Sequence, residues 1–277
     1  MKMRIALSFD VEDWYMGLEL PVSEWKGKER RLKVGLSRIL SLLNEKKIKA
    51  TFFILGVVCE MYPDEVKMIA DSGHEIGSHG YSHTMVYKLD PKSFRDEVRK
   101  TDARIVEITG KKPVGFRAPY FSITERSLWA LDILIEEGYI YDASIYPGYN
   151  YRYGIPDTPI GSYRYPGKEI VEFPVSTMEL LGRRIGIGGA YFRILPLFLT
   201  RRGIKMRGAE GIDTVIYLHP WEFDPKHPKI KVAPLATLTH YINLKRTYPR
   251  MKRLLNTYSF ATCRELVEGR YGRGSGR

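Results

Sequence analysis

This sequence of 277 residues has few cysteines and no long apolar segment. It has only two cysteines, Cys59 and Cys263, which match no metal-ligand spacing, so no disulfide framework is implied and two buried thiols are favoured. No stretch approaches the roughly 18 uninterrupted apolar residues that cross a bilayer. The apolar run after Met1 is too short for a signal-peptide core. We expect a cytoplasmic protein, free or peripheral to the inner membrane face.

Acidic residues are also in short supply. The chain has 32 Asp and Glu against 44 Lys and Arg, which gives a net charge of +12. This balance suits an anionic membrane or glycan, or only a solvated surface, and the lack of long basic arms argues against nucleic acid. The apolar run from Ile194 to Thr200 is followed by Arg201, Arg202, Lys205 and Arg207. It could lie flat on an anionic membrane, or be a helix packed on the protein with a basic outer edge.

Strand-like and helix-like stretches alternate along most of the chain. Apolar or β-branched runs predict strands, and 3.6-residue periodicity with capping residues predicts the helices between them. The predicted strands cover residues 5–9, 50–55, 74–79, 114–117, 139–142, 169–173 and 214–218, and the predicted helices include 32–46, 66–71, 91–109 and 124–137. This alternation predicts an α/β fold with a parallel sheet and outer helices. We expect one domain over residues 1–266 and a disordered tail over residues 267–277.

Unusual polar residues follow five of these strands, where α/β folds place their chemistry. The run Asp10-Val11-Glu12-Asp13 crowds three carboxylates, which repel one another unless one is protonated or a cation lies between them. His79 and His83 are four residues apart, a spacing that in a helical turn would bring both within reach of one metal ion. A divalent metal between these acids and imidazoles satisfies both patterns, whereas His74, His227 and His240 are interpreted as structural or solvated.

Five short motifs, in order, carry a family resemblance. They are Asp10-Val-Glu-Asp-Trp14, Gly77-Ser-His-Gly-Tyr-Ser-His83, Phe116-Arg-Ala-Pro-Tyr120, Tyr141-Asp-Ala-Ser144 and Tyr217-Leu-His219. Together they resemble the polysaccharide deacetylases, also called the NodB homology domain or carbohydrate esterase family 4, over nearly the whole chain. Residues 188–193 and 219–222 resemble the subgroup found beside exopolysaccharide and exosortase systems. The resemblance implies a distorted (β/α)7-type barrel.

The resemblance also assigns roles to residues of the site. It implies His79 and His83 as metal ligands, Asp10 as catalytic base and Arg117 as the residue that orients it. The family has two adjacent Asp where this chain has Val11 and Glu12 before Asp13. Strand alternation would place Glu12 beside Asp10, but a loop beginning at Val11 would cancel that rule, so we prefer Asp13 as the carboxylate ligand with Glu12 as the alternative.

The remaining motifs supply the other roles. Tyr120 resembles the residue whose backbone N–H helps hold the oxyanion, and Leu218 the residue that lines the pocket for the acetyl methyl group. His219 resembles the general acid, with Asp142 as the candidate tether for its imidazole. The default cofactor is Zn²⁺, although Co²⁺, Ni²⁺ or Fe²⁺ would fit the same ligands.

The expected reaction is metal-dependent removal of the N-acetyl group from an N-acetylated sugar, with release of acetate. One alternative is an allantoinase-like amide hydrolase acting on a small non-sugar compound, because a shared fold does not determine the substrate. A second is an inactive glycan-binding protein, which would need a broken metal or base position. The sequence does not specify the sugar or the oligomeric state.

Overall fold

The computed structural model describes residues 4–150 and 153–272 of the chain. The main sheet is built from short strands: β1 (Arg4–Val11), β2 (Thr51–Ile54), β3 (Glu75–Ser78), β4 (Gly115–Phe116), β5 (Tyr141–Asp142), β6 (Tyr163–Arg164), β7 (Val171–Glu172), β10 (Thr214–Leu218) and β11 (Ser259–Ala261). Strands β8 (Thr177–Leu180) and β9 (Arg183–Gly186) form a separate antiparallel hairpin. The predicted strands therefore exist, whereas β6, the hairpin and β11 had not been predicted.

The strand order of the main sheet is β10-β1-β2-β3-β4-β5-β7-β6, with β11 pairing to the beginning of β1. All of these pairings are parallel except that of β6 with β7. In the described part of the chain no pairing joins β10 to β6, so the curled sheet is a half-barrel. The predicted distorted α/β barrel is confirmed.

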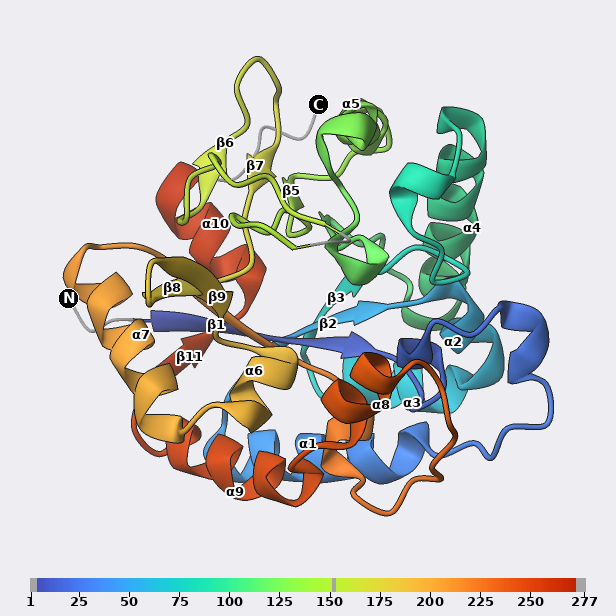
Figure 1. The fold of residues 1–277 in the computed structure, drawn as a ribbon. Helices are drawn as coiled ribbons and strands as arrows, with labels where there is room; N and C mark the ends of the chain where they lie inside the picture. The colour runs from blue at the N-terminus through green and yellow to red at the C-terminus, as the bar shows by residue number, and fades with distance from the viewer. Residues whose placement is uncertain (1–3, 151–152, 273–277) are drawn as a thin grey trace.

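Helices surround this sheet, with α4 and α9 on opposite sides of it (Figure 1). Their bounds are α1 (Leu32–Lys46), α2 (Gly56–Met61), α3 (Pro63–Asp71), α4 (Pro91–Thr109), α5 (Trp129–Glu136), α6 (Gly189–Ile194), α7 (Leu197–Ala209), α8 (Pro234–Tyr241), α9 (Leu244–Leu255) and α10 (Cys263–Tyr271). Local signals explain several boundaries. Asp90 accepts a hydrogen bond from the N–H of Ser93 at the start of α4, and Gly110 ends that helix in the left-handed region.

The apolar core lies on both sides of β1 and β2. Phe9 and Phe52, on these neighbouring strands, stack with their ring centroids 5.0 Å apart. Helix α1 covers them with Leu36, Ile39 and Leu43, all buried in the same cluster. Burial of this size contributes on the order of 1.5–3 kcal/mol per large side chain. The N-terminal strand is thus fixed at the centre of the fold, and the residues that follow it are positioned firmly.

Two sequence-based expectations differ from the structure near the C-terminal half. Residues 267–271, predicted to begin a disordered tail, belong to α10, which Thr262 and Glu265 cap reciprocally. The predicted tail beyond residue 272 lies outside the described residues. The run from Ile194 to Thr200 is divided by Pro196 between α6 and α7, because Pro196 cannot continue α6.

Arg207, which had been grouped with the candidate membrane-facing cations, points into the protein. Its guanidinium donates to the carbonyls of Thr177 at 3.3 Å and Ile160 at 2.7 Å, and to the hydroxyl of Thr214 at 3.1 Å. Across residues 4–150 and 153–272, no helix is long and apolar enough to span a bilayer.

Candidate active site

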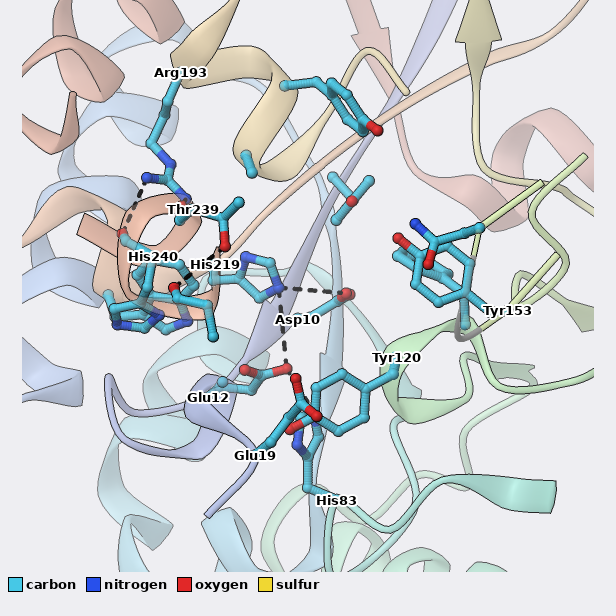
Figure 2. A pocket seen from close by; sticks show the side chains of 18 of the residues that line it. Asp10, Glu12, Glu19, His83, Tyr120, Tyr153, Arg193, His219, Thr239 and His240 are labelled. Atoms are coloured by element: carbon cyan, nitrogen blue, oxygen red, sulfur yellow. Dashed lines mark hydrogen bonds and ion pairs between the residues drawn. The ribbon is translucent and has the colours of Figure 1, made fainter. Parts of the chain in front are cut away.

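The registers of the sheet bring the ends of five strands to one edge. Phe9 of β1 lies opposite Leu218 of β10, Ile54 of β2 lies opposite Ser78 of β3, and Ser78 lies opposite Phe116 of β4. The residues that follow β3, β4 and β10 are His79, Arg117 and His219. They meet beside a cavity of about 340 Å³ whose lining includes Asp10, Glu12, His79, His83 and His219. Figure 2 shows several of these side chains converging.

Glu12, His79 and His83 form the group suited to a metal ion. Their candidate ligand atoms all lie within 4.8 Å of one another, and all three residues are buried. The Oε1 atom of Glu12 is 2.9 Å from Nε2 of His83 and 3.3 Å from Nε2 of His79. Metal bonds of about 2.1 Å at tetrahedral or octahedral angles place neighbouring ligand atoms about 3.0–3.4 Å apart. The spacing of these three residues therefore fits one divalent ion.

The hydrogen bonds of the two imidazoles agree with this fit. Nδ1 of His79 lies 2.7 Å from the backbone oxygen of Arg117, so Nδ1–H donates there and the lone pair remains on Nε2. Nε2 of His83 is buried, and its 2.9 Å contact with Glu12 does not have the geometry of a hydrogen bond. A buried nitrogen in this state is satisfied by a cation bound between it and Glu12.

The two histidines do not converge through a helical turn. Residues 79–83 form an irregular loop in which Gly80 has φ +75° and His83 has φ 60°. Gly80 adopts the left-handed region without steric cost, whereas His83 does so at a small cost. These two reversals of the backbone turn both rings toward Glu12.

The preference for Asp13 as the carboxylate ligand is corrected by the structure. Strand β1 continues to Val11, so the side chains of Asp10 and Glu12 point to the same side of the strand. Asp13 lies in the loop beyond, where the backbone N–H groups of Trp14 and Arg31 donate to it, each at 2.8 Å, together with the hydroxyl of Tyr62. Burial raises the pKa of Asp13 although these donors oppose the shift. Asp13 anchors the loop, and Glu12 faces the histidines.

Asp10 and Arg117 form a buried ion pair beside this group. Nη1 of Arg117 donates to Oδ1 of Asp10 at 2.7 Å and to the hydroxyl of Ser8 at 2.8 Å. The guanidinium also stacks on the ring of Phe53, at 4.2 Å from its centroid. These contacts lock the guanidinium and, through it, the orientation of the Asp10 carboxylate. Oδ2 of Asp10 remains directed toward the cavity side, 4.0 Å from Nε2 of His219.

His219 is held by Glu222 and not by Asp142. Nδ1 of His219 lies 2.7 Å from Oε1 of Glu222, in the same 3₁₀ turn, and Glu222 in turn accepts from Nε of Arg193 at 2.5 Å. Arg193 also donates to the carbonyls of Thr239, His240 and Ile242, so it is fixed on all sides (Figure 2). The result is a buried chain from Arg193 through Glu222 to His219, and its two supporting members were missed by the sequence analysis.

The charges around His219 favour its protonated form. Burial lowers the pKa of His219, but the carboxylates of Glu12, Glu222 and Asp10 outweigh this effect and raise the pKa to about 9. Nε2 lies 4.0 Å from Glu12 and from Asp10. The carboxylates around His219 therefore favour the form whose Nε2–H can donate a proton into the cavity.

Asp142, at the end of β5, supports the backbone that follows β4. The hydroxyl of Ser144 donates to Asp142 at 2.5 Å and accepts from the N–H of Ala118 at 2.7 Å. On the neighbouring strand, Glu172 lies in register with Asp142. Burial raises the pKa of Asp142 to about 6. The proposed tether is thus corrected: Asp142 braces the Arg117–Tyr120 turn, which positions Arg117.

Tyr120 lies at the cavity and Leu218 does not. Tyr120 lines the cavity, its ring packs 4.5 Å from that of His83, and its backbone is left-handed with φ 54°. Leu218 is completely buried in the core, and its neighbour Tyr217 faces the cavity. Side chains alternate along β10, so only one of the two can face the cavity. The expectation that Leu218 lines an acetyl pocket is therefore not met by this geometry.

The other three histidines pack against aromatic rings, and one of them also lines the cavity. His74 packs against Phe52, and burial lowers its pKa to about 4. His227 packs between Trp14 and other aromatic rings. His240 stacks on Trp221 with ring centroids 4.0 Å apart and also lines the cavity. These contacts agree with structural roles, with His240 forming part of the cavity wall.

Comparison with known families divides the chain into two matched parts. Residues 4–134 match the family model described as Polysaccharide deacetylase. Residues 143–268 match the model described as Domain of unknown function (DUF3473). Since β10 and β11 of the second part flank β1 of the first, the two matched parts share one sheet. The second part carries Arg193, His219 and Glu222.

Curated relatives match parts of this chain. The peptidoglycan deacetylase-like protein FGM2 of Gibberella zeae is 34% identical over 151 residues, which cover 52% of this chain and 44% of that protein. The peptidoglycan deacetylase of Helicobacter pylori is 36% identical over 113 residues, covering 41% of this chain and 38% of that protein. The chain thus spans less than half the length of these two relatives.

The fold is similar to that of solved structures along nearly its whole length. A Mycobacterium smegmatis protein, provisionally described as a polysaccharide deacetylase, has a TM-score of 0.63 at 19% identity, covering 96% of this chain and 90% of that chain. This likeness agrees with the half-barrel described above. Given the family model and the deacetylase relatives, the chain contains a polysaccharide deacetylase domain, matched over residues 4–134.

Proposed function

We propose that this protein is a metal-dependent hydrolase that removes N-acetyl groups from an N-acetylated glycan and releases acetate. The observation that carries the proposal is the convergence, in one cavity, of a three-ligand metal group, a carboxylate held by a buried arginine, and an imidazole held by a buried glutamate. The relatives described as peptidoglycan deacetylases support the substrate class. That the protein works beside an exopolysaccharide or exosortase system remains a prediction.

Each group of the cavity has a task in amide hydrolysis. Glu12, His79 and His83 would hold the metal, which supplies Lewis-acid activation of water and of the amide carbonyl when bound. Asp10, oriented by Arg117, accepts the proton of the attacking water. The N–H of Tyr120 is the proposed donor to the oxyanion. His219 delivers a proton from Nε2 to the leaving nitrogen, so that one amide and one water become acetate and a free amine.

Acetate release from a panel of N-acetylated oligosaccharides tests the proposal. We expect turnover of one or more glycans and none of small cyclic ureides such as allantoin. Turnover of ureides alone would favour the small-amide alternative. Binding of glycans without acetate release would favour the inactive alternative, which is otherwise disfavoured because base, acid and ligand positions are all filled.

The hydrogen bond from His219 to Glu222 leads to a prediction about pH. Glu222→Gln removes one of the carboxylates that raise the pKa of His219 to about 9, so the pKa should fall. Because His219 acts in its protonated form, activity is lost as pH rises through this pKa. The alkaline limb of kcat/KM should therefore move to lower pH, while the acidic limb stays in place as an internal control. An unmoved alkaline limb, in protein shown to be folded by circular dichroism, would contradict the role of Glu222.

Only part of helix α7 is exposed and available for the proposed contact with an anionic membrane. On α7, Thr200, Gly203, Ile204 and Arg207 face the protein, which agrees with a helix packed on the barrel. Arg201, Arg202 and Lys205 are exposed, as is 67% of Phe198. Three cations beside one exposed aromatic ring are the features that remain for an interfacial contact.

Cosedimentation with phosphatidylglycerol vesicles tests this contact. Each cation near an anionic surface contributes about 1 kcal/mol, so binding should be measurable at low salt and fade at high salt. Arg201→Glu combined with Arg202→Glu should weaken it. Absence of binding at low ionic strength, or binding indifferent to the double reversal, would leave α7 as ordinary packing.

A further inference from the structure

A second groove adjoins the catalytic cavity. It has a volume of about 490 Å³ and lies between the end of α6, the start of α7 and helix α9. Seven residues line it: Ile194, Pro196, Leu197, Arg246, Pro249, Arg250 and Arg253. Ile194 also lines the catalytic cavity, so the two spaces share a wall residue.

The groove carries positive charge without compensation. Arg246, Arg250 and Arg253 are spaced four and three residues apart and therefore share one face of α9. Within residues 4–150 and 153–272, no carboxylate oxygen is within 4.0 Å of these three guanidinium groups. Lys252 of the same helix, by contrast, pairs with Glu45 at 3.7 Å. Burial lowers the pKa of Arg250, and the charge of Arg246 lowers it further.

One of the three arginines is fixed in place. Nη1 of Arg250 donates to the carbonyls of Phe192 at 2.6 Å, Arg193 at 3.0 Å and Leu195 at 2.8 Å. Arg193 is the residue that holds Glu222 and, through it, His219. The wall of the groove is thus tied to the residues that position the general acid. An anion bound there would lie at a fixed place relative to the catalytic cavity.

We propose that this groove binds a phosphate group, and that the substrate is a glycan carrying phosphate near its N-acetylated sugar. The inference rests on the proposed deacetylase function and specifies its substrate class. Guanidinium groups bind phosphate through paired charge-assisted hydrogen bonds. Three arginines match a phosphomonoester or diphosphate, with two or more negative charges, better than a single carboxylate. The same chemistry is offered by a lipid headgroup, so the experiment separates the two sources.

The main test compares two N-acetylated oligosaccharides that differ only in a terminal phosphate. Wild type should have a kcat/KM at least about tenfold higher for the phosphorylated one, mainly through KM, because hydrogen bonds between charged groups are stronger than neutral ones. Arg246→Glu with Arg253→Glu should abolish this preference and leave turnover of the neutral glycan in place. Arg246→Gln with Arg253→Gln should also reduce the preference for the phosphorylated glycan. This milder double variant provides the same test if the reversal variant does not fold.

Arg201→Glu with Arg202→Glu is the matched control, because it changes charge equally on exposed positions of α7 that do not line the groove. It should retain the preference for phosphate. Equal loss in both reversal variants, or no preference in wild type, would overturn a glycan phosphate in the groove. A preference for a uronate-bearing glycan equal to that for phosphate would overturn the assignment to phosphate.

Two binding measurements separate the remaining outcomes. Inorganic phosphate titrated by calorimetry should bind wild type and the Arg201/Arg202 variant alike, and the Arg246/Arg253 variant about tenfold more weakly. If no glycan is deacetylated, this comparison still tests whether the groove binds phosphate. In that case only the proposed deacetylase function fails. Vesicle binding that the Arg246/Arg253 variant loses relative to wild type, without a preference of wild type for the phosphorylated glycan, would assign the phosphate to a lipid headgroup. If that variant binds inorganic phosphate as tightly as its control and vesicles as tightly as wild type, there is no phosphate site.

Discussion

Asp10→Asn should lower the turnover of an N-acetylated glycan by about 10²–10⁴-fold, the usual contribution of a general base. The amide cannot take up the proton of the attacking water, although it keeps the size of the carboxylate and can still accept from Arg117. Asp10 lies outside the group of residues suited to the metal, so the variant should retain its metal. The measurements are acetate release and metal content of the same preparation.

Ser8→Ala is the control for this variant. It removes another acceptor of the same guanidinium nitrogen of Arg117 and leaves the carboxylate of Asp10 in place. We expect a far smaller loss of turnover than for Asp10→Asn. Asp10→Asn protein that is folded and metal-loaded yet turns over within about threefold of wild type would remove Asp10 from the role of base, given the size of effect expected.

Glu12→Ala should release the metal, whereas Asp13→Ala should keep it. Glu12 lies 2.9 and 3.3 Å from the two imidazole nitrogens, and its loss leaves two ligands. Metal affinity should fall by more than about 100-fold, since losing only a hydrogen-bond partner of a ligand already costs about 10–100-fold. The matched measurement is the metal dissociation constant of each variant. Retained affinity in Glu12→Ala together with loss in Asp13→Ala would reverse the assignment.

The Asp13 variant has its own expected signature. Removing this carboxylate leaves the hydroxyl of Tyr62 and the N–H groups of Trp14 and Arg31 without their acceptor. Each unsatisfied buried group costs about 1–3 kcal/mol. Asp13→Ala should therefore lower the unfolding temperature while its metal content per folded molecule stays close to that of wild type.

Sequence patterns predicted the position of the site but not the choice between Glu12 and Asp13 as the metal ligand. The alternation of strand and helix, and the polar residues after successive strands, were sufficient to predict the parallel sheet and the edge that holds the site. The choice of ligand depended on where β1 ends, because a strand continuing to Val11 keeps Asp10 and Glu12 on the same side. The apolar run ends at Phe9, so its composition understates the length of the strand.

The residues that hold His219 in place were harder to predict from the sequence. Glu222 follows His219 by three residues, and their hydrogen bond depends on a 3₁₀ turn begun by Pro220. The sequence His-Pro-Trp-Glu contains that signal, since Glu three residues after a cap reaches back to it. Arg193, however, reaches Glu222 from a helix 29 residues earlier, and only the packing of α6 brings it there. The hairpin of β8 and β9 likewise carries short strands with weak alternation.

Acetate release before and after removal of metal tests the central claim most directly. The protein is treated with a chelator until metal analysis finds none, assayed on the best N-acetylated oligosaccharide, and assayed again after addition of Zn²⁺, Co²⁺, Ni²⁺ or Fe²⁺. We predict that activity disappears with the metal and returns with at least one of these ions in wild type, but not in His79→Ala or His83→Ala. Acetate release that continues undiminished in metal-free protein would contradict a metal-dependent deacetylase at Glu12, His79 and His83.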